Sequence, residues 1–237
     1  MKQDTLVQRA YTAVLEHFVK TGRAQHYIEL AATLGLRPEE AREAQRQAAE
    51  ASIACWFVND TDFVESWAPF SNVPTHYLVT IKGDQKWYGQ SGLEVLAVRW
   101  LFPKTEVRID TRCLDCGEPI VIRMRGKEIL EVDQVTTVGH VNIPFAKALT
   151  GEVTWGKSTW RTAWRRMNLF RSEEHVKNWS HYDTVSAESI MPLSIWATAF
   201  SGRLFRNRLE PDYLTRVMDY ADEMLVSLRK LGKADPL

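Results

Sequence analysis

The sequence predicts a mixed α+β protein in which a small helical N-terminal part precedes a core of strands and helices. Three observations support this fold class. Apolar residues recur at helical spacing within the first 50 residues. Alternating strand patterns follow between residues 75 and 143, and the chain is mostly helical again from Ser186 onward. We therefore expect a mixed sheet covered by helices.

The charge balance excludes some classes of partner. The chain of 237 residues has 30 Lys and Arg and 30 Asp and Glu, so its formal net charge is zero. A protein built chiefly to coat nucleic acid or an anionic membrane needs a basic surface, so both classes are disfavoured. With 45% apolar and 25% charged residues, the composition is that of an ordinary globular protein.

The expected location follows from the apolar runs and the cysteines. Charged residues interrupt every apolar run before it reaches the roughly 18 residues of a membrane span. The first residues, Met1 to Asp4, lead into an amphipathic helix pattern and not into a signal peptide. Three cysteines are too few for a disulfide scaffold. We expect a cytoplasmic protein without a membrane partner, and its oligomeric state stays open.

Three helices are predicted before residue 52. The first ends at Gly22, a C-terminal cap, and its apolar face consists of Leu6, Ala10, Ala13, Val14 and Phe18. A second, short helix over residues 26–34 stops at Gly35. The third opens with Pro38 and two acidic residues, where the helix dipole favours negative charge.

Two short strand patterns, 53–58 and 63–64, follow these helices and predict the outline of a winged helix. The third helix carries four glutamates against Arg42 and Arg46. A helix that enters the major groove is normally more basic than this. We therefore expect a packing role for the winged-helix-like part and treat DNA as a disfavoured partner.

Several landmarks of the chain occur in the order found in one enzyme family. They are Ala68 to Thr75, Trp87-Tyr88-Gly89 before a helix from Ser91 to Leu101, Thr111-Arg112-Cys113 with Gly117 to Ile120, Asn168 to Ser172 with Trp179, and Ala199 to Phe205. As an ordered set they resemble the organomercurial (alkylmercury) lyases. The resemblance covers residues 1–209. It implies a winged-helix-like part over 1–67, an alkylmercury-lyase-like core over 68–209, and an added C-terminal helix over 210–237.

The resemblance also implies which residues stand at the catalytic positions. In that family two cysteine thiolates hold the mercury, and an aspartate helps to deliver the proton that replaces it on carbon. The matching positions carry Ser91 for the first cysteine, Glu94 for the aspartate and Trp164 for the second cysteine. Serine and tryptophan cannot hold a soft metal as thiolates do. We therefore expect that this chain does not cleave carbon–mercury bonds by the family mechanism.

Ser91 and Glu94 allow two interpretations, and both stay open. They lie three positions apart at a helix start, so they share a face, and Glu94 is a candidate general acid or base with Ser91 as its neighbour. The same Ser-x-x-Glu spacing is also a capping box, which satisfies free amides of the first helical turn.

Cys113 and Cys116 form a CxxC pattern at a turn, which is half of a zinc site or a redox pair. A zinc site needs about two further ligands, and His140, His175 and His181 are not placed by the sequence. We favour a reduced structural turn over zinc or mercury at Cys113 and Cys116. The sequence therefore requires no cofactor.

The chain has nine tryptophans, and residues 155–166 combine several of them with arginines four positions apart. This segment predicts either a core stripe with a solvated edge or a pocket in which an arginine pairs with a carboxylate or phosphate. A lone histidine in an apolar strand pattern is more often a hydrogen-bonded core residue. The candidate ligand-binding residues are Phe70, Trp87, His140, Trp160, Trp164, Arg165 and Arg166.

The leading interpretation is a divergent alkylmercury-lyase-like enzyme that acts on a small organic substrate by lyase or hydrolytic proton transfer. Glu94 would be its acid or base. The first alternative is a non-catalytic small-molecule binder or a winged-helix transcriptional sensor. The second alternative is a genuine organomercurial lyase that uses Cys113 and Cys116. The sequence does not identify the substrate.

Overall fold

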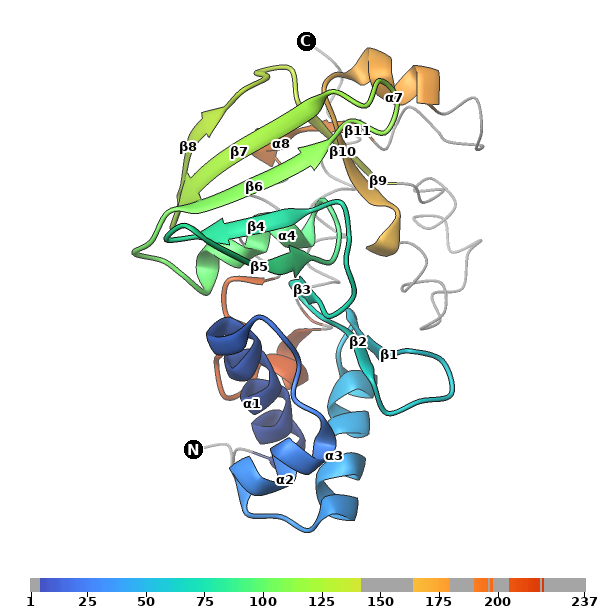
Figure 1. The fold of residues 1–237 in the computed structure, drawn as a ribbon, viewed down its shortest axis with the longest axis vertical. Coiled ribbons are helices and arrows are strands. Elements are labelled where there is room, and N and C mark those ends of the chain that lie inside the picture. The colour runs from blue at the N-terminus through green and yellow to red at the C-terminus, as the bar shows by residue number, and fades with distance from the viewer. Residues whose placement is uncertain are drawn as a thin grey trace.

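The computed structural model describes residues 5–141, 164–179, 190–195, 197, 205–217 and 219. Figure 1 shows three N-terminal helices beneath a long twisted sheet, with a second, smaller sheet beside it. The helices are α1 (Leu6–Thr21), α2 (Tyr27–Leu34) and α3 (Pro38–Ala51). No helix among these residues is both long and apolar enough to cross a membrane.

The ends of these helices lie where local sequence predicts them. The Thr5 side chain accepts a hydrogen bond from the Gln8 backbone N–H at 3.2 Å and so caps the start of α1. Gly22 and Gly35 end α1 and α2 in the left-handed conformation, and Pro38 is the first residue of α3. These three predictions are confirmed because each depends on only a few neighbouring residues.

The large sheet has the strand order β1-β2-β3-β5-β4-β6-β7-β8. Its strands are β1 (Cys55–Phe57), β2 (Val64–Trp67), β3 (Phe70–Ser71), β4 (Leu78–Ile81), β5 (Asp84–Gly89), β6 (Val107–Arg112), β7 (Pro119–Arg125) and β8 (Glu128–Val132). The sequence predicts a mixed sheet, whereas each described strand pair is antiparallel. Short turns impose the antiparallel direction on pairs that follow each other in the chain, such as β4–β5 and β6–β7, since parallel neighbours need long crossover connections.

The three N-terminal helices are followed in the chain by the antiparallel β1–β2 pair. The same two strands also begin the large sheet, because β2 pairs with β3 and β3 with β5. The sheet therefore runs across residues 67 and 68, where the resemblance implies a boundary between the two parts.

The predicted helix from Ser91 to Leu101 is shorter in the structure. It consists of α4 (Glu94–Ala97) and one 3-10 turn, Val98–Trp100. The small sheet has the order β10-β9-β11 and contains β9 (Val138–Val141), β10 (Met167–Phe170) and β11 (Ile190–Pro192). Two further helices, α7 (Glu173–Trp179) and α8 (Leu193–Ile195), follow β10 and β11.

Tyr77 connects the two sheets. Its hydroxyl donates a hydrogen bond to Asn168 Oδ1 at 3.2 Å and accepts one from the Leu169 backbone N–H at 3.2 Å. Tyr77 is fully buried, so both bonds form away from water, where a polar group without a partner is costly. The position of β10 relative to the large sheet is thereby defined.

Residues 205–217 return to the N-terminal helix α1. The ring of Tyr213 stacks on that of Tyr11, with centroids 5.4 Å apart. Gln8 accepts a hydrogen bond from the Leu214 backbone N–H at 2.9 Å and donates one to the Glu210 carbonyl at 3.3 Å. The beginning and the late part of the chain therefore pack against each other, next to α4 and the sheet.

Candidate active site

Glu94 begins α4 and is completely buried. Its carboxylate accepts hydrogen bonds from Arg208 Nη2 at 2.9 and 2.7 Å, one to each oxygen. The Trp164 indole N–H donates a third bond, 2.7 Å long, to Oε1. Three segments distant in sequence thus meet at one carboxylate. Charge-assisted bonds of this kind are roughly twice as strong as neutral ones.

Burial and charge have opposite effects on the pKa values of Glu94 and Arg208. Burial raises the pKa of the Glu94 carboxyl, while Arg208 and the Trp164 N–H oppose that rise. Burial acts to lower the pKa of the Arg208 guanidinium, but the charge of Glu94 together with the hydroxyls of Tyr213 and Tyr11 outweighs this, and the pKa is raised. Arg208 therefore stays charged. A carboxyl with a raised pKa is better suited to exchange protons near neutral pH than an exposed one.

Ser91 realises one half of the capping box. Its hydroxyl accepts a hydrogen bond from the Glu94 backbone N–H at 3.3 Å. The Glu94 carboxylate, which in a capping box would turn back to the Ser91 amide, instead bonds Trp164 and Arg208. Ser91 therefore bonds the first backbone amide of α4, whereas the Glu94 side chain bonds Trp164 and Arg208 and not the Ser91 amide.

The turn that carries Ser91 lies directly against β10. The Gly92 N–H donates a hydrogen bond to the Met167 carbonyl at 2.6 Å. A Cβ atom at Gly92 would lie 2.9 Å from that carbonyl oxygen and 2.9 Å from the Tyr77 hydroxyl, so only glycine fits here. Trp164 lies just before β10 in the chain. The contact at Gly92 therefore also brings Trp164 to Glu94.

Arg208 is the site residue that sequence reasoning missed. It is 1% exposed although arginine is rarely buried, and Tyr213 from the same segment lies beside it. Burial raises the pKa of the Tyr213 hydroxyl to about 12, although the charge of Arg208 opposes the rise. No local pattern distinguishes Arg208 from Arg203 or Arg206, so only the tertiary contact reveals it.

Three other predicted ligand-binding residues have different contacts. Trp87 donates its indole N–H to the Phe18 carbonyl at 2.8 Å and so anchors α1 to the sheet. Phe70 stacks on Phe18, with ring centroids 5.3 Å apart. His140 is buried in β9 with Phe170 and Trp179 at its ring edges. Trp160, also predicted, lies outside the described residues.

Arg165 lines a small cavity. The cavity of about 260 Å³ is lined by Trp56, Glu65, Tyr77, Gln90, Arg165 and five further residues. Arg165 forms an ion pair with Glu65 and lies 5.5 Å from the Trp56 ring centroid. Arg166 is exposed. Gln90 directly precedes Ser91 in the chain and Arg165 directly follows Trp164, whereas Ser91, Glu94 and Trp164 themselves do not line the cavity.

Gln90, one of the residues that line the cavity, has a side-chain acceptor without a partner in the described part of the chain. Its side-chain amide donates to the Ala54 carbonyl at 3.1 Å, which fixes the orientation of the amide. Its Oε1 atom is buried and has no hydrogen-bond partner among the described residues. Because buried acceptors are normally satisfied, this oxygen is suited to bind an N–H or O–H group of a ligand.

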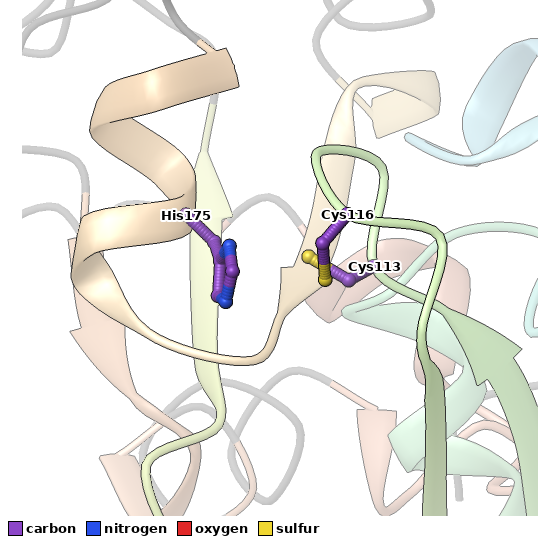
Figure 2. Close-up of side chains that lie close together, drawn as sticks. All are labelled: Cys113, Cys116 and His175. Atoms are coloured by element: carbon purple, nitrogen blue, oxygen red, sulfur yellow. The ribbon is translucent and has the colours of Figure 1, made fainter.

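A second cluster of reactive side chains lies at the turn between β6 and β7. The ligand atoms of Cys113, Cys116 and His175 all lie within 4.8 Å of one another. Figure 2 shows His175, which belongs to α7, facing the two sulfur atoms of the turn. Both thiols are free. The structure thus supplies the third ligand that the CxxC pattern lacks, while His181 lies outside the described residues.

Comparison with known proteins identifies the family. A family model described as alkylmercury lyase (MerB) matches residues 70–205. Among solved structures, one described as the mercury-bound form of MerB2 matches with a TM-score of 0.60 and 17% identity, covering 88% of this chain and 98% of that chain. No curated protein sequence matches. Because the family model spans more than half of the 237 residues, the chain belongs to the alkylmercury lyase family.

Proposed function

We propose that this member of the family is a lyase-like enzyme that transfers a proton to or from a small organic substrate, with Glu94 as the acid or base. The observation that carries the proposal is the burial of Glu94 at the family's acid position, with its pKa raised by that burial. A carboxyl in such an environment matches the requirement of general acid–base catalysis near neutral pH.

In this proposal Trp164 occupies the place beside the Glu94 carboxylate that the substrate would take. Its indole N–H bonds Glu94 Oε1 at 2.7 Å, and the ring is completely buried. A substrate would displace this N–H and take its place beside the carboxylate, while Arg208 keeps its own two bonds and holds the carboxylate in position. Ser91, which caps the Glu94 amide, would fix the start of α4.

The cavity lined by Gln90 and Arg165 supports a small, uncharged, hydrogen-bonding substrate. Its arginine, Arg165, is already paired with Glu65, so the cavity offers no unpaired charge of its own for a carboxylate or phosphate among the described residues. Gln90 Oε1 is a free acceptor, and the Trp56 ring supplies a flat apolar wall. This set of groups suits a molecule with one N–H or O–H donor next to a flat or apolar part.

A defined mixture tests this function. The purified chain is incubated in deuterium oxide with small ketones, alcohols and amides, and proton NMR follows exchange, elimination and hydrolysis. We expect turnover of at least one compound, and a loss of about 10²- to 10⁴-fold in Glu94→Gln. Glu16→Gln is the matched control, because Glu16 is exposed on α1. Equal turnover by folded Glu94→Gln and by the native chain would contradict the proposal.

Carbon–mercury cleavage by Cys113 and Cys116 is the second candidate, and one observation favours it. The two sulfur atoms lie within 4.8 Å of the His175 ring, which would deliver the proton in place of the family's acid. Benzene release from phenylmercuric acetate is the measurement. Release by the native chain that is lost in Cys116→Ser would support this candidate, and no release by the native chain would exclude it.

Contacts of α3 argue against a DNA-reading function. Arg42 and Arg46 both form ion pairs with Asp62 of the β1–β2 turn, at 2.9 and 2.5 Å. The two guanidinium groups that would contact phosphates are thereby held by one carboxylate, which offsets part of their charge. We infer that the winged-helix-like part has a packing role: its α1 supports the segment that carries Arg208.

A further inference from the structure

We propose that Cys113, Cys116 and His175 bind a single zinc ion that ties the β6–β7 turn to α7. This site is separate from the Glu94 cluster, and it does not depend on the proposed function. Two thiols and one imidazole are the ligand types that zinc prefers, and their ligand atoms lie within 4.8 Å of one another.

The turn presents both thiols on the same side. The Cys113 N–H donates to the Glu118 carbonyl at 2.9 Å, and the Gly117 N–H donates to the Cys113 carbonyl at 2.9 Å. Gly117 has a φ of 73°, in the left-handed region that glycine adopts without strain, so the chain reverses directly after Cys116. Figure 2 shows the two sulfur atoms close together on the side that faces α7.

His175 is oriented by a carboxylate. Asp115, within the same turn, lies with Oδ2 2.7 Å from His175 Nδ1. This contact engages Nδ1 and leaves Nε2 as the nitrogen for a metal. A carboxylate on the second nitrogen of a ligating histidine is a recurrent feature of zinc sites, because it fixes the tautomer and the ring orientation. The turn therefore supplies two ligands and also the group that positions the third.

Charge and distance both fit one divalent cation. Two thiolates and a neutral imidazole carry a charge of −2, which neutralises a zinc ion, and the thiol protons are released on binding. Ligand atoms on one tetrahedral zinc ion lie about 3.8 Å apart when the metal–sulfur distance is about 2.3 Å. Side-chain rotation has to close the cluster by only about 1 Å from the 4.8 Å limit. The described residues supply three ligands, so a water molecule would take the fourth position of a tetrahedral zinc ion.

Zinc is favoured over mercury by the third ligand. A mercuric ion is satisfied by thiolates alone, so it gives no reason for an imidazole held beside them by Asp115. Zinc binds thiolate and imidazole together. A metal here would link α7, and with it β10, to the end of the large sheet, in addition to the Tyr77 contact.

Metal titration of the full chain tests the site. The protein is reduced, freed of metal with a chelator, and titrated with Zn²⁺ against a chromophoric competitor, with Co²⁺ as a spectroscopic probe. We expect one ion per chain and a thiolate-to-cobalt absorption band. Cys116→Ser should bind at least about 100-fold more weakly and lose the band, and Asp115→Asn should bind about 10-fold more weakly. Cys55→Ser, which removes the remaining cysteine, is the matched control and should bind as the native chain does.

Circular dichroism separates loss of ligands from loss of fold. Cys116 is exposed, so its substitution leaves the core intact, whereas Cys113 is buried and is less suited to the test. Zinc should also raise the unfolding temperature of the native chain but not that of His175→Ala. Equal zinc affinity in the native chain and Cys116→Ser overturns the proposal. Uptake of Hg²⁺ by the two cysteines without uptake of Zn²⁺ overturns it as well.

Discussion

Glu94 and Arg208 lie 114 positions apart in the sequence and form a salt bridge 2.7 Å long from which solvent is excluded. The side chains are 0% and 1% exposed. A buried charge that loses its partner is strongly unfavourable, whereas an exposed ion pair contributes little. The pair therefore affects both the stability of this region and the protonation of Glu94, the candidate catalytic acid.

The first prediction concerns the loss of one partner. Arg208→Met leaves the Glu94 charge buried without its cation, so the free energy of unfolding should fall by about 3–5 kcal/mol. Urea denaturation at pH 7 measures the change. Arg206→Met is the matched control, because Arg206 is exposed and should change stability by less than about 1 kcal/mol. Equal losses of unfolding free energy in the two variants would show that the buried pair contributes no more to stability than an exposed arginine does.

The second prediction concerns Trp164→Phe. The substitution keeps an aromatic ring but removes the N–H that bonds Glu94 and lowers its pKa, so that pKa should rise further. Carbon NMR of the labelled Glu carboxyl groups follows the titration directly. The same change at Trp87, whose indole N–H bonds the Phe18 carbonyl, should leave the Glu94 titration unmoved. An unchanged Glu94 pKa in Trp164→Phe would rule out the indole as a tuning group.

The third prediction concerns the close contact at Gly92. A methyl group there would lie 2.9 Å from the Met167 carbonyl oxygen, so Gly92→Ala must displace β10 or the turn. Overpacking of this kind costs about 1–3 kcal/mol. Gly83→Ala is the comparison, since a methyl group at Gly83 would meet no atom within 4 Å and only the φ of 81° is unfavourable. Thermal unfolding should rank Gly92→Ala as the less stable variant, and the reverse order would contradict the proposed contact.

The fourth prediction concerns pH. The hydrogen bonds from Arg23 lower the pKa of Glu29 to about 2, from an ordinary value of 4.5. An acid with a lowered pKa stabilises the folded chain above its unfolded pKa, and this contribution is lost as pH falls from 4.5 toward 2. Both side chains are more than a third exposed, so the contribution is at most about 1 kcal/mol.

Glu29→Gln tests this dependence. The difference in unfolding free energy between the native chain and the variant should be largest near pH 7 and should shrink as the pH approaches 2. High salt should reduce the difference at pH 7, because exposed ion pairs are screened. A difference that stays constant across this pH range would mean that the Glu29 charge is not involved.

Local sequence patterns predicted much of the fold. The caps at Gly22 and Gly35, the start of α3 at Pro38 and the alternating strands of the core depend on neighbouring residues, and the structure confirms them. The predicted mixed sheet differs from the structure, in which the described strand pairs are antiparallel. Strand direction depends on how segments meet in space, which local patterns do not contain. The helix after Ser91 is also shorter than its apolar pattern indicates.

The sequence by itself determined the C-terminal ends of α1 and α2, the start of α3, the family resemblance, and the absence of cysteine at Ser91 and Trp164. Each of these can be read from residue identity and spacing along the chain. Only the tertiary structure decided that Glu94 meets Arg208, and that His175 meets Cys113 and Cys116. These contacts join segments separated by long stretches of chain, and they depend on the packing of β10, α7 and residues 205–217 against the sheet. No local pattern contains that packing, since burial and long-range proximity arise only when the whole chain has folded.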